Sequence, residues 1–332
     1  MLEQREKLWD YDVVEPGQQG PPTVVNLTAE HISQYALVAQ NPHPQFRGPS
    51  GSPRLVAMPT MVLSYAPLMR EDIAESNGFV ALERSTTARR QTPFAKCEIR
   101  WSRPVVAGDT ITATRRVLEK YERRGSKFVT FRIEASNQRG DEVAQYDYTC
   151  IFAYAQGQRA VPQNPGQAQP ASPQPETQDP TRHVSFDTLA VGDNLAALSI
   201  SESQEIINRK NNFRLVGEPS ASNIHTDEEF ARQNIFGGTV NSGPATMSYV
   251  DQMLQRSFPL EAFYQGGQLL MRAIEPFRVG DTVTFEGEIT GKSPRLPASP
   301  HEKGGIVECR VKGINQRGDL VSLSDATLVL SE

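Results

Sequence analysis

The residue best suited to acid–base chemistry is His225, in the segment N-I-H-T-D-E-E-F-A at residues 223–231. An imidazole titrates near neutral pH, so it can take a proton from water or substrate and later return it. Thr226 and Glu229 have the spacing of an S/T-x-x-E capping box, which predicts a helix directly after the histidine. We therefore expect His225 to be a general base whose ring direction is fixed by that helix.

A second candidate group is the backbone N–H of Gly243, just ahead of Pro244. Backbone N–H groups at a helix N-terminus stabilise negative charge that develops on a bound substrate. Pro244 has no N–H and cannot supply a second donor. Polar neighbours that we predict to contact substrate or water are Asn223, Asn241 and Ser242.

Both groups lie in the second of two sequence repeats. The first copy contains P-V-V-A-G-D-T at residues 104–110 and N-Q-R-G-D at 137–141. The second copy contains P-F-R-V-G-D-T at residues 276–282 and N-Q-R-G-D at 315–319. A repeat of this length predicts two fused copies of one domain. Only the second copy carries the histidine segment. His43, in the first copy, has no acid nearby and is predicted to be a loop residue.

The predicted elements follow the same order in each copy. A short helix is expected at residues 28–39 and again at 201–213, where Ser201 and Gln204 suggest a capping box. A longer helix is expected next, and in the second copy it starts near Pro244 with an apolar face. Strands are then predicted at residues 110–118, 128–136 and 143–154, and at 282–289, 305–314 and 320–330.

These patterns predict an α+β fold in which each half is an antiparallel sheet wrapped around a central helix. The predicted domains are residues 1–155 and 183–332, joined by a Pro- and Gln-rich linker at 156–182. A second Pro-rich excursion, at residues 293–304, is predicted to be a long hairpin loop.

Composition narrows the class of protein. The chain has 332 residues, 38% of them hydrophobic, which suffices for two ordinary cores. No apolar run is long enough for a membrane helix and the N-terminus lacks a secretion-type apolar region, so a cytoplasmic location is expected. The net charge of −5 argues against nucleic-acid binding. Three scattered cysteines predict neither a disulfide framework nor a metal site.

The second copy resembles a known family. It is similar to the MaoC-like, hydratase-2 type enoyl-thioester hydratases and dehydratases in their double hotdog form. The active-site segment of that family reads G-D-x-N-P-x-H-x-D-x-x-x-A, followed by F-x-x-x-[IV]-x-H-G. Here the corresponding residues read S-A-S-N-I-H-T-D-E-E-F-A at 220–231, followed by F-G-G-T-V-N-S-G-P at 236–244. The residues on matching positions are His225, Asp227, Ala231, Phe236, Val240 and Gly243.

The resemblance implies reversible hydration of an enoyl thioester to a (R)-3-hydroxyacyl thioester, carried by coenzyme A or an acyl carrier protein. His225 would be the base and the Gly243 N–H the oxyanion hole, with no metal or redox cofactor. The first copy would be noncatalytic, and its segment V-A-M-P-T-M at 56–61 resembles a substrate channel, which implies substrate contacts from Met58 and Pro59. A homodimer of double hotdogs is possible, whereas nucleic-acid and membrane partners are not expected.

The sequence departs from the family at two positions. The catalytic aspartate five residues before the histidine is Ser220 here, and the histidine of the H-G pair is Ser242. Glu218 is the nearest upstream acid and is the candidate replacement. Three functions stay open: a hydratase or dehydratase with a substitute acid, an isomerase or cyclase that uses the same enolate-stabilising pocket, and an acyl-thioester-binding module without catalysis.

Overall fold

A ten-stranded antiparallel sheet forms the framework of the protein. The computed structural model describes residues 6–48, 55–156, 184–220, 222–294 and 304–331. The predicted linker and most of the Pro-rich excursion lie outside these residues. In spatial order the strands are β2 (Thr23–Asn26), β5 (Thr110–Arg123), β6 (Ser126–Ser136), β7 (Glu142–Ala153), β4 (Phe94–Trp101), β9 (Gln268–Ala273), β12 (Leu320–Ser331), β11 (Gly304–Asn315), β10 (Thr282–Pro294) and β8 (Leu198–Ser201).

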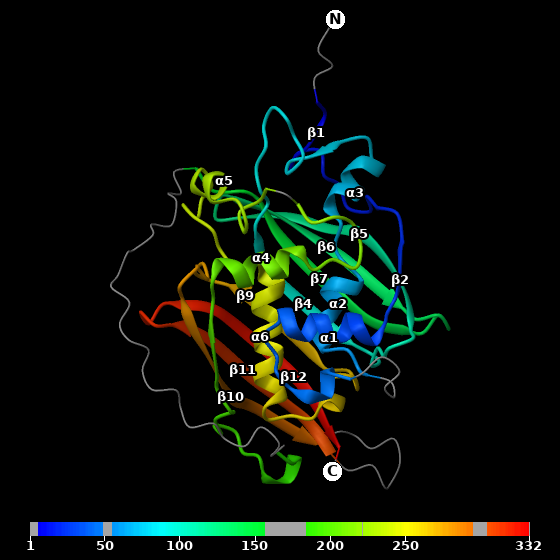
Figure 1. Cartoon of the computed structure of the whole chain (residues 1–332), viewed down its shortest axis with the longest axis vertical. Coiled ribbons are helices and arrows are strands. Elements are labelled where there is room, and N and C mark those ends of the chain that lie inside the picture. The colour runs from blue at the N-terminus through cyan, green and yellow to red at the C-terminus, as the bar shows by residue number, and fades with distance from the viewer. Residues whose placement is uncertain (1–5, 49–54, 157–183, 221, 295–303, 332) are drawn as a thin grey trace, which may run out of the picture.

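The sheet consists of two equivalent halves joined edge to edge. Strands β2, β5, β6, β7 and β4 match β8, β10, β11, β12 and β9 in order, and the halves meet where β4 pairs antiparallel with β9 (Figure 1). Cys97 lies opposite Met271 at this junction, and both side chains are fully buried. The α+β fold expected from the repeat is therefore confirmed, with the two sheets merged into one.

The repeated N-Q-R-G-D motif makes the same tight hairpin in each half. The side-chain oxygen of Asn137 accepts hydrogen bonds from the backbone N–H groups of Arg139 and Asp141. Asn315 makes the same pair of bonds in the second half. The glycine of each motif has a positive φ, +80° for Gly140 and +87° for Gly318, which is the reason for a glycine there.

The central helix of the second half is α6 (Gly243–Gln255), which begins as predicted beside Pro244. Met247, Val250 and Met253 are fully buried on its apolar face, against the sheet. The inward residues of β10 alternate with exposed ones, so Val283 and Phe285 meet the helix while Glu286 faces outward. In Figure 1, α6 lies across the sheet between the two halves.

The first half has no helix of comparable length. Its counterpart is a single 3₁₀ turn, η2 (Pro59–Met61), followed by one turn of α2 (Val62–Tyr65). Pro67 follows closely, and a proline disfavours helical backbone at the residue before it. The chain then forms α3 (Arg70–Ser76). Helix α6 therefore has no counterpart of equal length in the first half.

A buried hydrogen-bond network ties these two central segments together. Asp251 of α6 is fully buried and accepts hydrogen bonds from the Thr60 backbone N–H at 2.9 Å and the Thr60 hydroxyl at 2.6 Å. Burial raises the pKa of Asp251 to about 6, and the bonds from Thr60 oppose that rise. Tyr35 donates its hydroxyl to the Thr60 oxygen and extends the network.

The short helices α1 (Ala29–Val38) and α4 (Gln204–Asn212) lie side by side over the same face as α6 (Figure 1). Thr28 caps α1 as predicted, accepting from the His31 N–H. The cap expected at Ser201 is corrected: Ser201 lies in β8, and Ser203 caps α4 by accepting from the Ile206 N–H at 3.2 Å. Pairing of β8 with β10 extends the strand through Ser201 and delays the helix.

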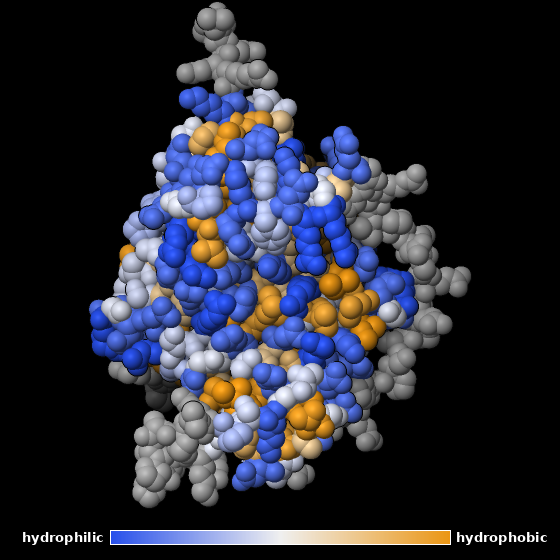
Figure 2. Space-filling view, turned by 180° about the vertical axis from the view of Figure 1, so that it is seen from behind, coloured by the Kyte–Doolittle hydropathy of each residue, from blue (hydrophilic) through white to orange (hydrophobic). Residues whose placement is uncertain are grey.

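The remaining elements are short. They are β1 (Leu8–Trp9), β3 (Val80–Ala81), η1 (Pro44–Phe46), η3 (Phe186–Thr188), η4 (Leu260–Phe263) and α5 (Glu228–Arg232). No helix within the described ranges is both long and apolar enough to cross a membrane. The face seen from behind is largely hydrophilic, with separate apolar patches (Figure 2).

Candidate active site

His225 lies in a loop that is held from two sides. The side-chain oxygen of Asn223 accepts hydrogen bonds from the backbone N–H groups of His225 at 2.8 Å and Thr226 at 3.1 Å. Gln204 of α4 donates to the His225 carbonyl at 2.8 Å. Asn223 is itself buried and bonded to Asn211, so it holds the loop. This turn, rather than a helix cap at Thr226, fixes the histidine.

The capping box expected at Thr226 is therefore corrected. Asp227 is the N-cap of α5, since its carboxylate accepts from the Phe230 N–H at 3.0 Å. The Thr226 hydroxyl instead donates to the Asn223 oxygen, and the helix begins at Glu228. An aspartate is as good a cap as a threonine, and the turn around Asn223 already uses Thr226.

The imidazole has a defined tautomer. Its Nδ1 lies 2.8 Å from the carbonyl oxygen of Val240, and because a carbonyl only accepts, Nδ1 carries the proton. Nε2 is then the basic nitrogen. Burial lowers the pKa of His225 to about 4, and the positive charges of Arg214 and Arg70 lower it further, while the bond to Val240 acts in the opposite direction. The ring is neutral at physiological pH.

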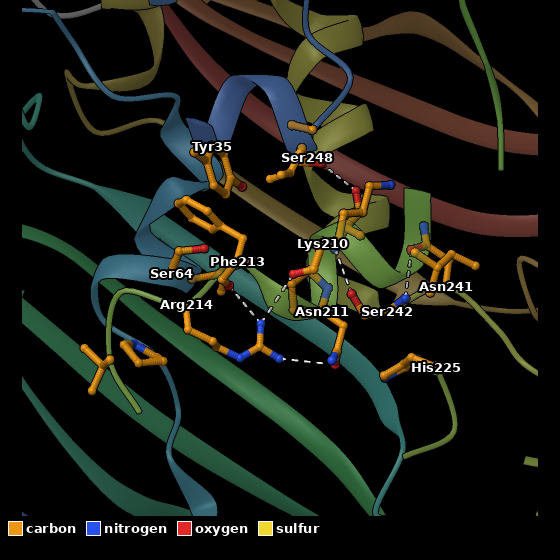
Figure 3. Close-up of a pocket in the computed structure, with 18 of the residues that line it drawn as sticks. Tyr35, Ser64, Lys210, Asn211, Phe213, Arg214, His225, Asn241, Ser242 and Ser248 are labelled. Carbon is orange, nitrogen blue, oxygen red and sulfur yellow. Dashed lines mark hydrogen bonds between the residues drawn. The ribbon is translucent and has the colours of Figure 1, made fainter. Parts of the chain in front are cut away.

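His225 lies where two cavities meet. The first, which we call the Arg214 cavity, has a volume of about 300 Å³ and is bounded by α1, α2, α4 and α6 (Figure 3). The second, the Phe94 cavity, has a volume of about 340 Å³ and lies against β4, β9 and the start of α6. The residues that line both are Tyr148, His225, Asn241 and Ser242.

Two N–H donors are available at this meeting point. Ser242 caps α6 by accepting from the Ala245 N–H at 3.3 Å, which leaves the Gly243 N–H without an acceptor among the described residues. The side-chain amide nitrogen of Asn241 is buried and also has no acceptor within the described ranges, although its oxygen accepts from the Ser242 N–H. The Asn241 amide is a buried donor without a partner, which is costly, and the Gly243 N–H is half-buried beside it, so both are suited to a bound oxygen atom.

Gly243 is required at its position by packing. A Cβ atom there would lie 2.3 Å from Cγ of Phe94, a residue of β4 in the first half. Phe94 in turn contacts the Tyr148 ring edge-on, with centroids 5.1 Å apart. The aromatic pair from the first half therefore closes directly onto the N-terminus of α6.

Tyr148 is a site residue that the sequence analysis missed. It lies on β7 of the first half, lines both cavities, and burial raises the pKa of its phenol well above the usual value. The phenol therefore keeps its proton and can act as a hydrogen-bond donor. A tyrosine in an alternating strand looks like an ordinary core residue, so no signal in the sequence distinguished it.

Arg214 and Lys210 were also missed. Lys210 pairs with the buried Glu202 at 2.6 Å, and burial lowers the pKa of the lysine to about 8 although Glu202 opposes this. Within the described ranges, Arg214 donates to neutral acceptors, which are the carbonyls of Phe213 at 2.9 Å and Lys210 at 3.4 Å and the Asn211 side-chain oxygen at 3.4 Å. Both cations line the Arg214 cavity (Figure 3).

Several predicted site residues do not reach the cavities. Glu218 is exposed and lines neither one. Ser220 also lies outside them, with its hydroxyl donated to the Ser222 carbonyl at 2.9 Å. Met58 and Pro59 are buried at the start of the 3₁₀ turn η2, where the Pro59 carbonyl accepts a hydrogen bond from the Trp101 side chain.

His43 of the first half lies outside both cavities as well, and its ring nitrogen accepts from the Gln45 N–H. The predicted residues that do come together are His225, Asn241, Ser242 and Gly243, with Asn223 behind them. No cluster of metal-binding side chains occurs among the residues that the structure describes.

Two domain models match the chain, one in each half. The MaoC like domain matches residues 209–303, and the FAS1-like dehydratase domain region matches residues 16–146. Together with the fold they place the protein in the broad class of hydratases and dehydratases. The two matches and the double hotdog fold support assignment of the chain to the MaoC-like hotdog family. No curated protein matches the sequence significantly.

Solved structures share the fold over nearly the whole chain. A MaoC-like dehydratase is 18% identical, with 95% of this chain and 99% of that chain covered and a TM-score of 0.65. A MaoC domain protein from Chloroflexus aurantiacus J-10-fl is 14% identical, with 99% of each chain covered and a TM-score of 0.64. A double hotdog protein from Mycobacterium tuberculosis is 14% identical, covering 96% and 98%, with a TM-score of 0.56. At these identities the likeness concerns the fold.

Proposed function

We propose that the protein adds water reversibly to an enoyl thioester, forming a 3-hydroxyacyl thioester. The observation that supports this most is the convergence of a neutral, oriented histidine with two partnerless N–H donors where two cavities meet. A thioester has two arms, the acyl group and the carrier, and two cavities that meet at one histidine can each take one arm. Coenzyme A and an acyl carrier protein are both suitable carriers.

In the proposed mechanism, Nε2 of His225 takes a proton from water as the water oxygen bonds to the β-carbon. Negative charge moves to the thioester oxygen, where the Gly243 N–H and the Asn241 amide stabilise it. The imidazolium then gives its proton to the α-carbon. A pKa lowered to about 4 makes His225 a weak base but makes its conjugate acid strong, which favours this second step.

One histidine thus performs both proton transfers in the proposal. Glu218 and Ser220, the sequence-based candidates for a separate acid, lie outside the cavities. Glu275 is the one carboxylate that lines either cavity in the described part of the chain, and it is exposed at the rim of the Phe94 cavity. Asn223 and Ser242 have positioning roles, through the histidine loop and the cap of α6.

The test is turnover of a crotonyl thioester, followed by mass spectrometry of the product. The unaltered protein should add one water, and His225→Ala should lower kcat by about 10²- to 10⁴-fold. His43→Ala is the matched control and should retain activity, because that ring lies outside both cavities. Equal losses of kcat in the two variants, or a loss only in His43→Ala, would contradict the assignment of the active site to His225.

The single proton-transfer group also favours a second candidate, an isomerase. One base that removes an allylic proton and returns it elsewhere needs no separate acid, and the same donors would stabilise the intermediate enolate. A product whose mass equals that of the substrate, with a displaced double bond, would identify this reaction. Binding without turnover of either kind would instead indicate a noncatalytic thioester-binding module.

A further inference from the structure

The charge on the walls of the Arg214 cavity is not balanced. Among the described residues, its lining includes the cations Lys210 and Arg214 and no aspartate or glutamate. Lys210 is compensated from behind the wall, because Glu202 is fully buried against it and also accepts a hydrogen bond from Tyr249. Arg214 is the cation left over.

Arg214 has no carboxylate within ion-pair distance in the described part of the chain. Glu71 is the acid that acts on it electrostatically, yet Glu71 forms its ion pair with Arg84 at 2.9 Å. The hydrogen-bond partners of Arg214 among the described residues are two backbone carbonyls and one amide oxygen, all neutral. Arg214 is also exposed to solvent, which partly screens its charge. Since a guanidinium keeps its charge at any ordinary pH, Arg214 adds a permanent positive charge to the cavity lining.

This charge lies close to the reacting atoms. Arg214 and His225 line the same cavity, Figure 3 shows the guanidinium beside Asn211, and the charge of Arg214 acts on the imidazole. The phosphates of a pantetheine carrier lie at the far end of a long, uncharged arm with two amides. With the thioester at His225, the acyl group is the part of the substrate nearest to a cation that lines the same cavity as the base. The acyl group, rather than the carrier, would therefore lie beside Arg214.

We infer that the Arg214 cavity binds a carboxylate carried by the acyl group, so that the substrate is the thioester of a short unsaturated dicarboxylic acid. This inference rests on the proposed thioester chemistry. The guanidinium presents a planar fork that matches a carboxylate, and a charge-assisted pair of this kind is stronger than neutral hydrogen bonds. A cavity of about 300 Å³ suits a short acyl group.

The chemistry needs no additional reactant. In the simplest substrate of this class, a fumaryl monothioester, the β-carbon bears the carboxylate. Water loses one proton to Nε2 of His225, its oxygen bonds to the β-carbon, and the α-carbon takes up the proton. The product is a malyl thioester, with hydroxyl and carboxylate on the same carbon beside Arg214.

The experiment compares fumaryl-coenzyme A with crotonyl-coenzyme A, which has the same length but a methyl group in place of the carboxylate. For the unaltered protein, kcat/KM should be at least about tenfold higher for the fumaryl thioester, as expected for a charged group met by a matching partner. Arg214→Met should lower that preference by about 10²-fold. Methionine keeps most of the apolar stem and removes the charge.

The ratio between the two substrates is the informative quantity. Loss of Arg214 also changes the pKa of His225, but that change affects both substrates alike and cancels in the ratio. Arg209→Met is the matched control: Arg209 lies on α4 with a side chain 53% exposed, outside both cavities, and its replacement should leave the ratio unchanged. An unaltered protein that prefers crotonyl, or an Arg214→Met variant with an unchanged ratio, would overturn the inference.

A failure of the proposed function is distinguishable from a failure of the inference. If neither thioester reacts, the affinities of the protein for the same two compounds, measured by calorimetry, test the carboxylate site separately. Tighter binding of fumaryl-coenzyme A that Arg214→Met abolishes would support the carboxylate site while the hydration proposal falls. Equal affinities for the two thioesters would overturn the carboxylate site.

Discussion

Nδ1 of His225 donates to the carbonyl oxygen of Val240 across 2.8 Å, which leaves Nε2 as the basic nitrogen of the ring. Because the pKa of the ring is lowered to about 4, its base form is present above that pH and is lost as pH falls through it. We therefore expect the acid limb of kcat/KM to lie near pH 4, rather than near the ordinary histidine value of 6.5. A pH–rate profile measures this directly.

Arg214→Met provides the check on that profile. The positive charge of Arg214 disfavours the imidazolium, so its removal should raise the pKa of His225 and move the acid limb toward neutral pH. An acid limb near 6.5 in the unaltered protein, or one that does not move in the variant, would contradict the assignment of the titration to His225.

Asn241→Asp separates the donor from the acceptor of that side chain. The aspartate keeps an oxygen for the Ser242 N–H but replaces the partnerless amide nitrogen with an acceptor. We expect kcat to fall by about 10²- to 10³-fold, as for loss of one oxyanion donor. The control is Asn26→Asp, where an exposed asparagine oxygen also accepts a hydrogen bond, and this variant should keep kcat unchanged. A small effect on kcat at Asn241 would exclude its amide from the oxyanion site.

Glu218→Gln and Ser220→Asp test the missing acid. Glu218 lies outside both cavities, so its amide variant should retain kcat within about twofold, as exposed groups away from the chemistry do. Ser220→Asp should not raise activity, because its side chain would face the Ser222 carbonyl, an acceptor that repels a carboxylate. Steady-state kinetics on a crotonyl thioester suffice. Loss of most activity in Glu218→Gln would restore the model of a substitute acid.

Thr60→Val tests how the halves are held together. The change removes the hydroxyl that donates to Asp251 and leaves a buried carboxylate with one donor fewer. We expect the free energy of unfolding in urea to fall by about 1–3 kcal/mol. Thr110→Val, which removes an exposed hydroxyl bonded to Asn26, should cost much less. Equal losses would mean that the Thr60–Asp251 contact adds nothing specific.

The sequence predicted the parts of the fold that depend on local patterns. Asn137 and Asn315 head identical hairpins, so the repeated motif located three strands in each half to within a few residues. Strands β4 and β9 were not predicted, although the alternation of Cys97, Ile99 and Trp101 was a usable signal for β4. Strand β9 reads Q-L-L-M-R-A, and its less buried Leu270 is as apolar as its buried neighbours, so no alternation is visible in the sequence.

The site was predictable only where one segment supplied it. His225 and Gly243 lie within a single recognisable stretch of the chain. Tyr148 and Phe94 reach the same place only because β4 pairs with β9 and the first half closes on α6, which is a long-range contact that no local pattern encodes. Residue spacing alone also suggested Glu218 as an acid, and the exposed position of that residue depends on the path of a whole loop.

The pairing of β4 with β9 also bears on solubility. A second half on its own would present the six residues of β9 as an open strand edge, with unpaired backbone groups that invite association with other chains. Fusion covers that edge permanently within one molecule. The sheet then terminates at β2 and β8, each only four residues long, which offers little template for strand addition. The first half thus covers a strand edge of the second half that would otherwise favour aggregation, and this role does not require a catalytic histidine in the first half.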